Sequence, residues 1–371
     1  MHKKEKRVHE PLLHITKRDH MVWWESWLIR LAAILSALIV CSLVIVLLTG
    51  YNPVQVYAAM LKGAFGSQRK IWITFQNTAM LLCIALAVTP AFKMRFWNIG
   101  AEGQVLIGGL ATAGCMIYAG GRLPAPLLML LMVAASVASG MIWAVIPAIF
   151  KAKWGTNETL FTLMMNYVAI QLVSFFTVVW ENPKGSATVG VINAVGKEGW
   201  IPALFGQKYL FNILVVLLIA AVLFVYLKYS KQGYEIAVVG ESENTARYIG
   251  INVKKVIIRT MAISGALCGV AGLLLVSGTD HTISTNTAGG QGFTAIMVSW
   301  LAKFNPFIMM LTSFLIIFLQ RGAGEIATAF RLNQSVSDIL TGIILFFIIG
   351  CEFFVNYKLH FRGAQKEGEK C

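Results

Sequence analysis

Long apolar runs recur along this chain of 371 residues, and many are about as long as a lipid bilayer is thick. Hydrophobic residues make up 57% of the sequence and charged residues 13%, whereas soluble proteins are about one-quarter charged. A water-soluble fold of this size could not bury so much apolar surface. Because backbone groups in lipid must be hydrogen-bonded internally, runs of this length predict helices. We therefore predict an all-α, polytopic integral membrane protein.

The apolar runs predict about ten transmembrane segments, including short or broken helices. They lie in a membrane domain of residues 27–356, between a basic tail (1–26) and a C-terminal tail (357–371). Three of the runs, 105–120, 293–304 and 306–319, are well short of the roughly 20 residues of a perpendicular crossing. The sequence leaves open whether 293–304 and 306–319 each cross. The ten segments are 27–49, 72–92, 105–120, 125–150, 160–180, 209–227, 256–277, 293–304, 306–319 and 336–354.

The basic residues orient these segments. The formal net charge is +14, which in a soluble protein would suggest a nucleic-acid partner. In a membrane protein, lysine and arginine collect on the cytoplasmic side instead. With the N-terminus in the cytoplasm, 21 of the 31 basic residues fall inside. We therefore expect a multi-pass membrane protein with both termini cytoplasmic and no nucleic-acid partner.

Two short segments begin with the same pair of residues. Gly103-Gln104 opens the third segment and Gly290-Gln291 opens the eighth, and in this topology the two segments run in opposite directions. Short, glycine-interrupted segments at matching places in two inverted halves are typical of transporter binding sites. Gly-Gln is also a common dipeptide, so chance is the alternative to an inverted repeat.

Polar residues gather in residues 96–104, at the start of the third segment. Asn98 can cap a helix there, and Glu102 is favoured at a helix N-terminus by the helix dipole. A plain helix start accounts for Asn98 well and for Glu102 in part. The glycines of this run leave backbone groups open to a partner, so contact with a solute is the second interpretation.

Amides also lie inside the apolar runs themselves. Gln76 and Asn77 belong to the second segment and Asn166 to the fifth, and a buried amide needs hydrogen-bond partners. A neighbouring helix is the more common partner. A polar solute is the other.

The connection between the sixth and seventh segments contains a candidate docking helix. In residues 240–251, Glu243 and Arg247 are four residues apart, as in a helical ion pair, and Gly250 can end the helix. Tyr248 and Ile249 give this helix an apolar side. Such a helix lies either at the membrane interface or against a soluble partner.

These motifs resemble the permeases of bacterial ABC importers, in the subgroup that takes up sugars, branched-chain amino acids and nucleosides. The similar stretches are 98–104, 240–251 and 289–294, and the resemblance covers about residues 51–354. Within the subgroup, the chain is most similar to the larger of two permeases of nucleoside (guanosine-type) uptake systems. Such permeases often carry Asn-Pro near Glu243-Asn244, and this chain departs from them by having no proline there.

The resemblance implies a coupling segment at residues 230–255, with a short helix that sits in a groove of an ATPase subunit. The other implied partners are a second permease, which would make a heterodimer, an extracytoplasmic substrate-binding lipoprotein and the lipids of a bacterial plasma membrane. The residues implied in ATPase coupling are Glu241, Glu243, Ala246, Arg247, Tyr248 and Gly250.

On this resemblance we expect a membrane subunit of an ATP-driven importer of purine nucleosides, with a simple sugar or a branched-chain amino acid as the alternative solute. The sequence contains no G-x-x-x-x-G-K-[ST] motif, so ATP and Mg²⁺ would be bound by the partner ATPase. We expect no catalytic residue, metal or cofactor in this chain. Amides and aromatic side chains suit a neutral solute, and the candidate pathway residues are Asn77, Asn98, Glu102, Gln104, Asn166, Gln291, Phe293 and Trp300.

Two rival functions come from other classes. One is a secondary carrier that works alone. Proton-coupled carriers usually keep ionisable residues inside the membrane, and these segments hold almost none. The other is an intramembrane enzyme, for which the segments lack paired carboxylates, a histidine cluster or a Ser/His arrangement.

Overall fold

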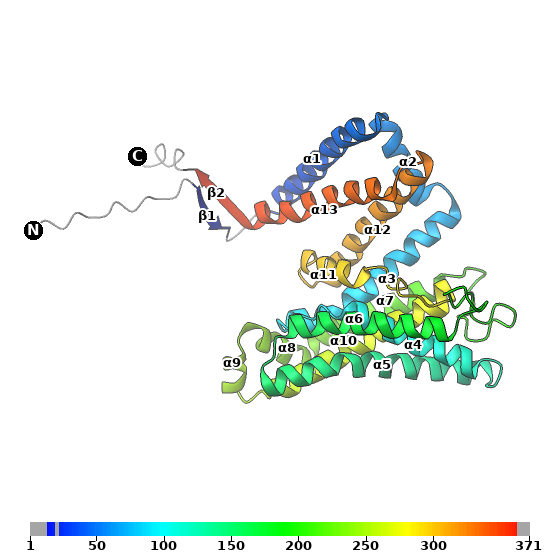
Figure 1. Cartoon of the computed structure of the whole chain (residues 1–371). Coiled ribbons are helices and arrows are strands. Elements are labelled where there is room, and N and C mark those ends of the chain that lie inside the picture. Colours follow the sequence, from blue (N-terminus) through cyan, green and yellow to red (C-terminus); the bar gives the residue numbers. More distant parts are fainter. Residues whose placement is uncertain (1–12, 19–21, 362–371) are drawn as a thin grey trace, which may run out of the picture. The chain divides into compact units, whose positions relative to one another are not determined.

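The structure, a computed structural model, describes residues 13–18 and 22–361, and most of them are helical (Figure 1). This confirms the prediction of a polytopic all-α membrane protein. The predicted tails fall partly outside the described residues, at 1–12, 19–21 and 362–371. The helices are α1 (Trp23–Thr49), α2 (Pro53–Phe65), α3 (Gln68–Lys93), α4 (Ala101–Ala119), α5 (Ala125–Trp154), α6 (Glu158–Val179), α7 (Leu210–Tyr229), α8 (Lys231–Glu241), α9 (Glu243–Tyr248), α10 (Val253–Leu275), the π-helical turn η1 (Val276–Asp280), α11 (Gln291–Leu301), α12 (Pro306–Ala329) and α13 (Gln334–Asn356).

The chain divides into two compact units, one of residues 1–63 and 319–371 and one of residues 64–318. In the first unit, the first and last long helices lie together. Arg30 of α1 donates to the Glu352 carboxylate of α13 at 2.7 Å. Beyond them, the short strands β1 (Leu13–Lys17) and β2 (Tyr357–Phe361) pair antiparallel. The hydropathy pattern predicted neither the strands nor this pairing of the chain ends.

The core of the second unit is built around α3 and α10. In each of these helices 72% of the apolar span is buried, against 22–28% in α5, α6 and α7. Small residues allow the surrounding helices to come close. A Cβ on Gly269 of α10 would overlap the carbonyl oxygen of Ser136 in α5, and one on Gly272 would overlap that of Val105 in α4. Such backbone contacts are a main source of helix association in lipid.

Substituting Gly269 is therefore expected to destabilise this unit. In Gly269→Ala the new methyl group has no space against the α5 backbone, and overpacking of this kind costs about 1–3 kcal/mol. The matched control is Gly114→Ala in α4, because a Cβ there would lie 3.5 Å from Trp180, an ordinary contact distance. We expect a lower thermal unfolding midpoint in detergent for Gly269→Ala only. Equal midpoints would show that α5 and α10 do not pack this closely.

Eight of the described helices are long and apolar enough to cross a membrane. The helix α11 has only 11 residues, in agreement with the short segment predicted there. The prediction for 306–319 was too short, since α12 continues to Ala329 and is one of the eight. Gln320, Arg321 and Glu325 end the apolar run, yet all three are good helix formers, so the helix passes through them. The helix α2 was not among the segments predicted from the sequence.

The connection between α6 and α7 is folded against the end of α10. The Ile192 N–H donates to the His281 carbonyl at 2.8 Å, and the Ile201 N–H donates to the Ser277 carbonyl at 3.2 Å. The Trp200 ring stacks on the His281 ring, with centroids 3.7 Å apart. This long polar segment therefore covers η1 and one end of the core.

Candidate functional site

The turn between α3 and α4 is held by a reciprocal pair of amides. The Asn98 and Gln104 side chains each donate to the other's oxygen, at 3.4 and 3.1 Å, and Asn98 also donates to Ser264 Oγ of α10 at 3.3 Å. Asn98 and Gln104 are buried, with 0% and 1% of their surface exposed. Their side-chain amides are thus hydrogen-bonded within the bundle. Asn98 does not cap α4 as predicted, because its Oδ1 accepts the N–H of Gly100, ahead of the first helical turn, and the N-cap position of α4 is Gly100, with no side-chain cap.

Asn166 of α6 fastens the same turn from the other side. Its Oδ1 accepts the Gly103 N–H at 2.8 Å, and its Nδ2 donates to the Ile99 carbonyl at 2.8 Å. A Cβ at position 103 would lie 2.9 Å from Asn166 Oδ1, so glycine is what allows this close approach. The sequence left open whether Asn166 bonds to another helix or to a solute. In this conformation it bonds to α4 and to the turn before it.

Glu102 joins the start of α4 to the start of α11. Its two carboxylate oxygens accept the N–H groups of Gly290 and Gly292, at 2.8 and 2.7 Å, and the residue is 6% exposed. A Cβ on Gly292 would lie 2.5 Å from the Glu102 backbone nitrogen. The two Gly-Gln segments that the sequence singled out are thus in direct contact through one carboxylate.

The short helix α11 presents an aromatic face. Phe293 and Trp300, about two helical turns apart, are 44% and 45% exposed. Trp300 stacks on Trp97, with centroids 5.5 Å apart and planes 22° apart, and Trp97 is itself 46% exposed. At the start of α11, Gln291 Oε1 is buried and has no hydrogen-bond partner among the described residues. Aromatic surface and an unpaired acceptor therefore lie on one short helix.

A second polar cluster lies around η1, and it includes Gln76, an amide noted in the sequence, and Asn212, which was not predicted. The Gln76 side chain donates to Thr279 Oγ1 at 2.6 Å, and Asn212 donates to the Leu274 carbonyl at 3.3 Å. Gln76 Oε1 and Asn212 Oδ1 are buried without a partner in the described part of the chain. Asn212 could have been found from the sequence, because it is an isolated amide within the apolar run of α7. The predicted Asn77 lies beside Gln76 on α3 and is half-buried.

The predicted coupling segment contains two short helices, α8 and α9, joined at Ser242. The Ser242 hydroxyl accepts the Thr245 N–H at 3.2 Å and so caps α9, which begins without a proline. Buried residues anchor the segment: Ile236 and Gly240 of α8, and Ala246 of α9. The Glu235 carboxylate also accepts from Arg259 of α10 at 2.9 Å.

The other predicted coupling residues are exposed. Glu241, Glu243 and Arg247 lie at the surface, with Arg247 donating to Glu243 at 3.0 Å. Tyr248 is 93% exposed. Gly250 ends the segment with a left-handed φ of +83°. The helix pair is thus anchored on the bundle by buried residues and by the Glu235–Arg259 ion pair, and it carries Glu241, Glu243, Arg247 and Tyr248 on its exposed side.

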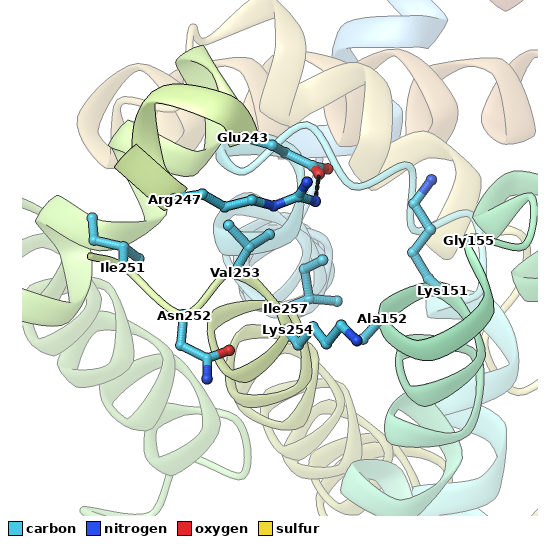
Figure 2. Close-up of a pocket in the computed structure, with 10 residues that line it drawn as sticks. All are labelled: Lys151, Ala152, Gly155, Glu243, Arg247, Ile251, Asn252, Val253, Lys254 and Ile257. Atoms are coloured by element: carbon cyan, nitrogen blue, oxygen red, sulfur yellow. Dashed lines mark hydrogen bonds and ion pairs between the residues drawn. The ribbon is translucent and has the colours of Figure 1, made fainter. Parts of the chain in front are cut away.

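Beside α9 lies a cavity of about 700 Å³ (Figure 2). Its walls come from α9, the first turns of α10 and the end of α5, and the view in Figure 2 shows side chains from all three elements around one space. Its lining residues are Lys151, Ala152, Gly155, Glu243, Arg247, Ile251, Asn252, Val253, Lys254 and Ile257.

Comparison with known proteins gives a consistent result over most of the chain. Residues 72–349 match the family model for the branched-chain amino acid transport system permease component. A glucose ABC transporter permease protein of Haloferax volcanii is 27% identical, over 94% of this chain and 93% of that one. A guanosine ABC transporter permease protein of Bacillus subtilis is 29% identical, over 91% and 97%. A nucleoside ABC transporter permease protein of Lactococcus lactis is 28% identical, over 88% and 91%.

Proposed function

This chain belongs to the branched-chain amino acid transport system permease component family, and on that premise we propose that it imports a purine nucleoside. It is a multi-pass ABC permease subunit, and its energy comes from an ATPase partner. The solute is supported by the names of two relatives, a guanosine permease and a nucleoside permease. The similar glucose permease makes a sugar the second candidate.

The observation that carries the choice of solute is the exposed aromatic face of α11. A purine base is flat and neutral, and it stacks on aromatic rings with a gain of about 1–3 kcal/mol per base. Phe293, Trp300 and Trp97 offer such rings, and Gln291 at the start of α11 offers an acceptor, Oε1, that has no donor among the described residues. Of the predicted pathway residues, Phe293, Trp300 and Gln291 are therefore proposed to contact solute. Asn98, Glu102, Gln104 and Asn166 are proposed to hold the pathway in shape.

Replacing Trp300 is expected to weaken purine recognition. Trp300→Ala removes the ring stacked on Trp97, and the loss of one stacking surface raises the KM for guanosine uptake about tenfold. The measurement is uptake of radiolabelled guanosine by cells that carry the complete transporter. Trp24→Ala is the matched control, since Trp24 is an exposed indole that belongs to α1 in the other unit. An unchanged KM for Trp300→Ala, or an equal change in sugar uptake, would contradict a purine stacking site.

We also propose that α8 and α9 form the surface that docks on the ATPase. Anchoring by Gly240 and Ala246 supports this, because force from a partner can reach α3 and α10 only through a rigid connection. The exposed Tyr248 and the Glu243–Arg247 pair supply the docking contacts. This assignment puts the segment on the cytoplasmic side and, by the charge distribution, both termini there as well. Glu241 and Gly250 complete the docking segment.

The remaining partners are a second permease, which would form a heterodimer with this chain, and an extracytoplasmic binding lipoprotein that delivers the solute. They are proposed on the similarity to two-permease nucleoside systems. Co-purification of the tagged chain from native membranes, followed by mass spectrometry, tests both. Recovery of this permease with the ATPase alone would indicate a homodimer.

A further inference from the structure

The cavity beside α9 is lined by one basic side chain, Lys254, that has no acidic partner among the residues that the structure describes. Of the cations that line it, Lys151 is paired with Glu158 at 2.8 Å and Arg247 with Glu243 at 3.0 Å. Lys254 is exposed and has no ion pair or side-chain hydrogen bond within residues 13–18 and 22–361. The cavity therefore carries a net positive charge, at a position between three helices (Figure 2).

We infer that this cavity receives an acidic side chain, carried on a short segment of the ATPase subunit, and that Lys254 is its counter-ion. The inference rests on the proposed docking of α8 and α9. A space of about 700 Å³ is larger than one carboxylate needs and is in the range of sites that hold a small ligand or several side chains. Complementary charge at such a surface sets the register of docking and excludes wrong partners.

The position of the cavity would allow a bound ATPase segment to transmit movement to the helices around it. A segment seated there touches α9, the beginning of α10 and the end of α5 at once. Further along the same two long helices, Gly140 of α5 and Gly265 of α10 face each other, with no room for a Cβ on either. Helices packed backbone to backbone move together, so a displacement of the acidic segment is passed to the core of the unit as well as to the docking helix.

Charge reversal at neighbouring lysines tests the inference. Lys254 lines the cavity, whereas the adjacent Lys255 is also exposed and does not. Lys254→Glu and Lys255→Glu change the net charge by the same amount, so any general effect of surface charge is shared. Binding of the purified cognate ATPase to the complete membrane complex in detergent is measured at several salt concentrations, and size-exclusion profiles check that each variant is folded.

We expect Lys254→Glu to weaken ATPase binding roughly tenfold and to reduce its salt dependence, while Lys255→Glu changes binding less than about twofold. An acidic-to-lysine substitution on the ATPase should then restore binding to Lys254→Glu and not to Lys255→Glu. Equal effects of the two variants, or none, overturn the inference. It is also overturned if Lys254→Glu alters binding only in vesicles of anionic lipid, because the occupant is then a lipid headgroup. Failure of the wild-type complex to bind any ATPase would instead refute the proposed function.

Discussion

Gly240→Leu is expected to abolish ATP-driven uptake while leaving the protein in the membrane. A Cβ on Gly240 would overlap the carbonyl oxygen of Lys93, where the end of α8 lies on the end of α3. Leucine adds three more carbon atoms to a position with no space for the first. The helix α8 must then move away from α3, and α9 moves with it, because only Ser242 separates the two helices.

The reason for a large effect is geometric. A docking helix displaced by even an ångström or two no longer passes the movement of the ATPase into the bundle. The substitution lies outside the eight candidate spans, so insertion should be normal. Gly324→Leu in α12 is the matched control, since it is the same substitution at a glycine whose Cβ would meet no neighbouring atom of the described residues within 4 Å. Guanosine uptake and membrane abundance are measured for both variants, and uptake near the wild-type rate in Gly240→Leu would show that α8 does not transmit the motion.

Glu102→Ala is expected to cause the second large loss. The substitution leaves the N–H groups of Gly290 and Gly292 without their acceptor, in a place that is 6% exposed. Hydrogen bonds to a charged group contribute about 1.5–3 kcal/mol each. Losing both should release the start of α11, lower the thermal unfolding midpoint and reduce uptake at least tenfold. Glu102→Gln retains one acceptor oxygen and should give an intermediate result.

The chain offers a close control for this second prediction. The Glu181 carboxylate also accepts two backbone N–H groups, from Gly185 at 2.9 Å and Ala187 at 3.3 Å, but these bonds lie at the surface of the α6–α7 connection. Water can replace that carboxylate, so Glu181→Ala should change stability and uptake little. If Glu102→Ala behaves like Glu181→Ala in both measurements, the contact between α4 and α11 is not important for the fold or for transport.

The sequence alone predicted those helices that are marked by one long apolar run. It predicted the spans of α3, α5 and α7 because lipid demands about 20 apolar residues from each of them. It was insufficient where polar residues continue a helix, as Arg321 and Glu325 do in α12. A hydropathy pattern ends at such residues, whereas backbone hydrogen bonding does not.

The candidate site shows a similar division. The polarity of residues 96–104 marked a special turn, but not which atoms meet there. Glu102 and Gly290 are 188 residues apart, and Asn98 and Ser264 are 166 apart, so their hydrogen bonds exist only after the helices have packed. A buried amide needs hydrogen-bond partners, and either a neighbouring helix or a bound solute can provide them. The sequence of a single chain does not show which of the two it is. Helix packing supplies the partners of Asn166, whereas Gln291 Oε1 has no partner in the described part of the chain.

The central claim is a separation of roles: this chain forms the route through the membrane, and an ATPase docked on α8 and α9 supplies the energy. The most direct measurement is uptake of radiolabelled guanosine by proteoliposomes made with the purified chain, its second permease, the binding protein and the ATPase. We predict uptake only when the ATPase and ATP are both present, and none with the Gly240→Leu variant. Uptake by the chain alone under an ion gradient, without ATPase or ATP, would contradict the account.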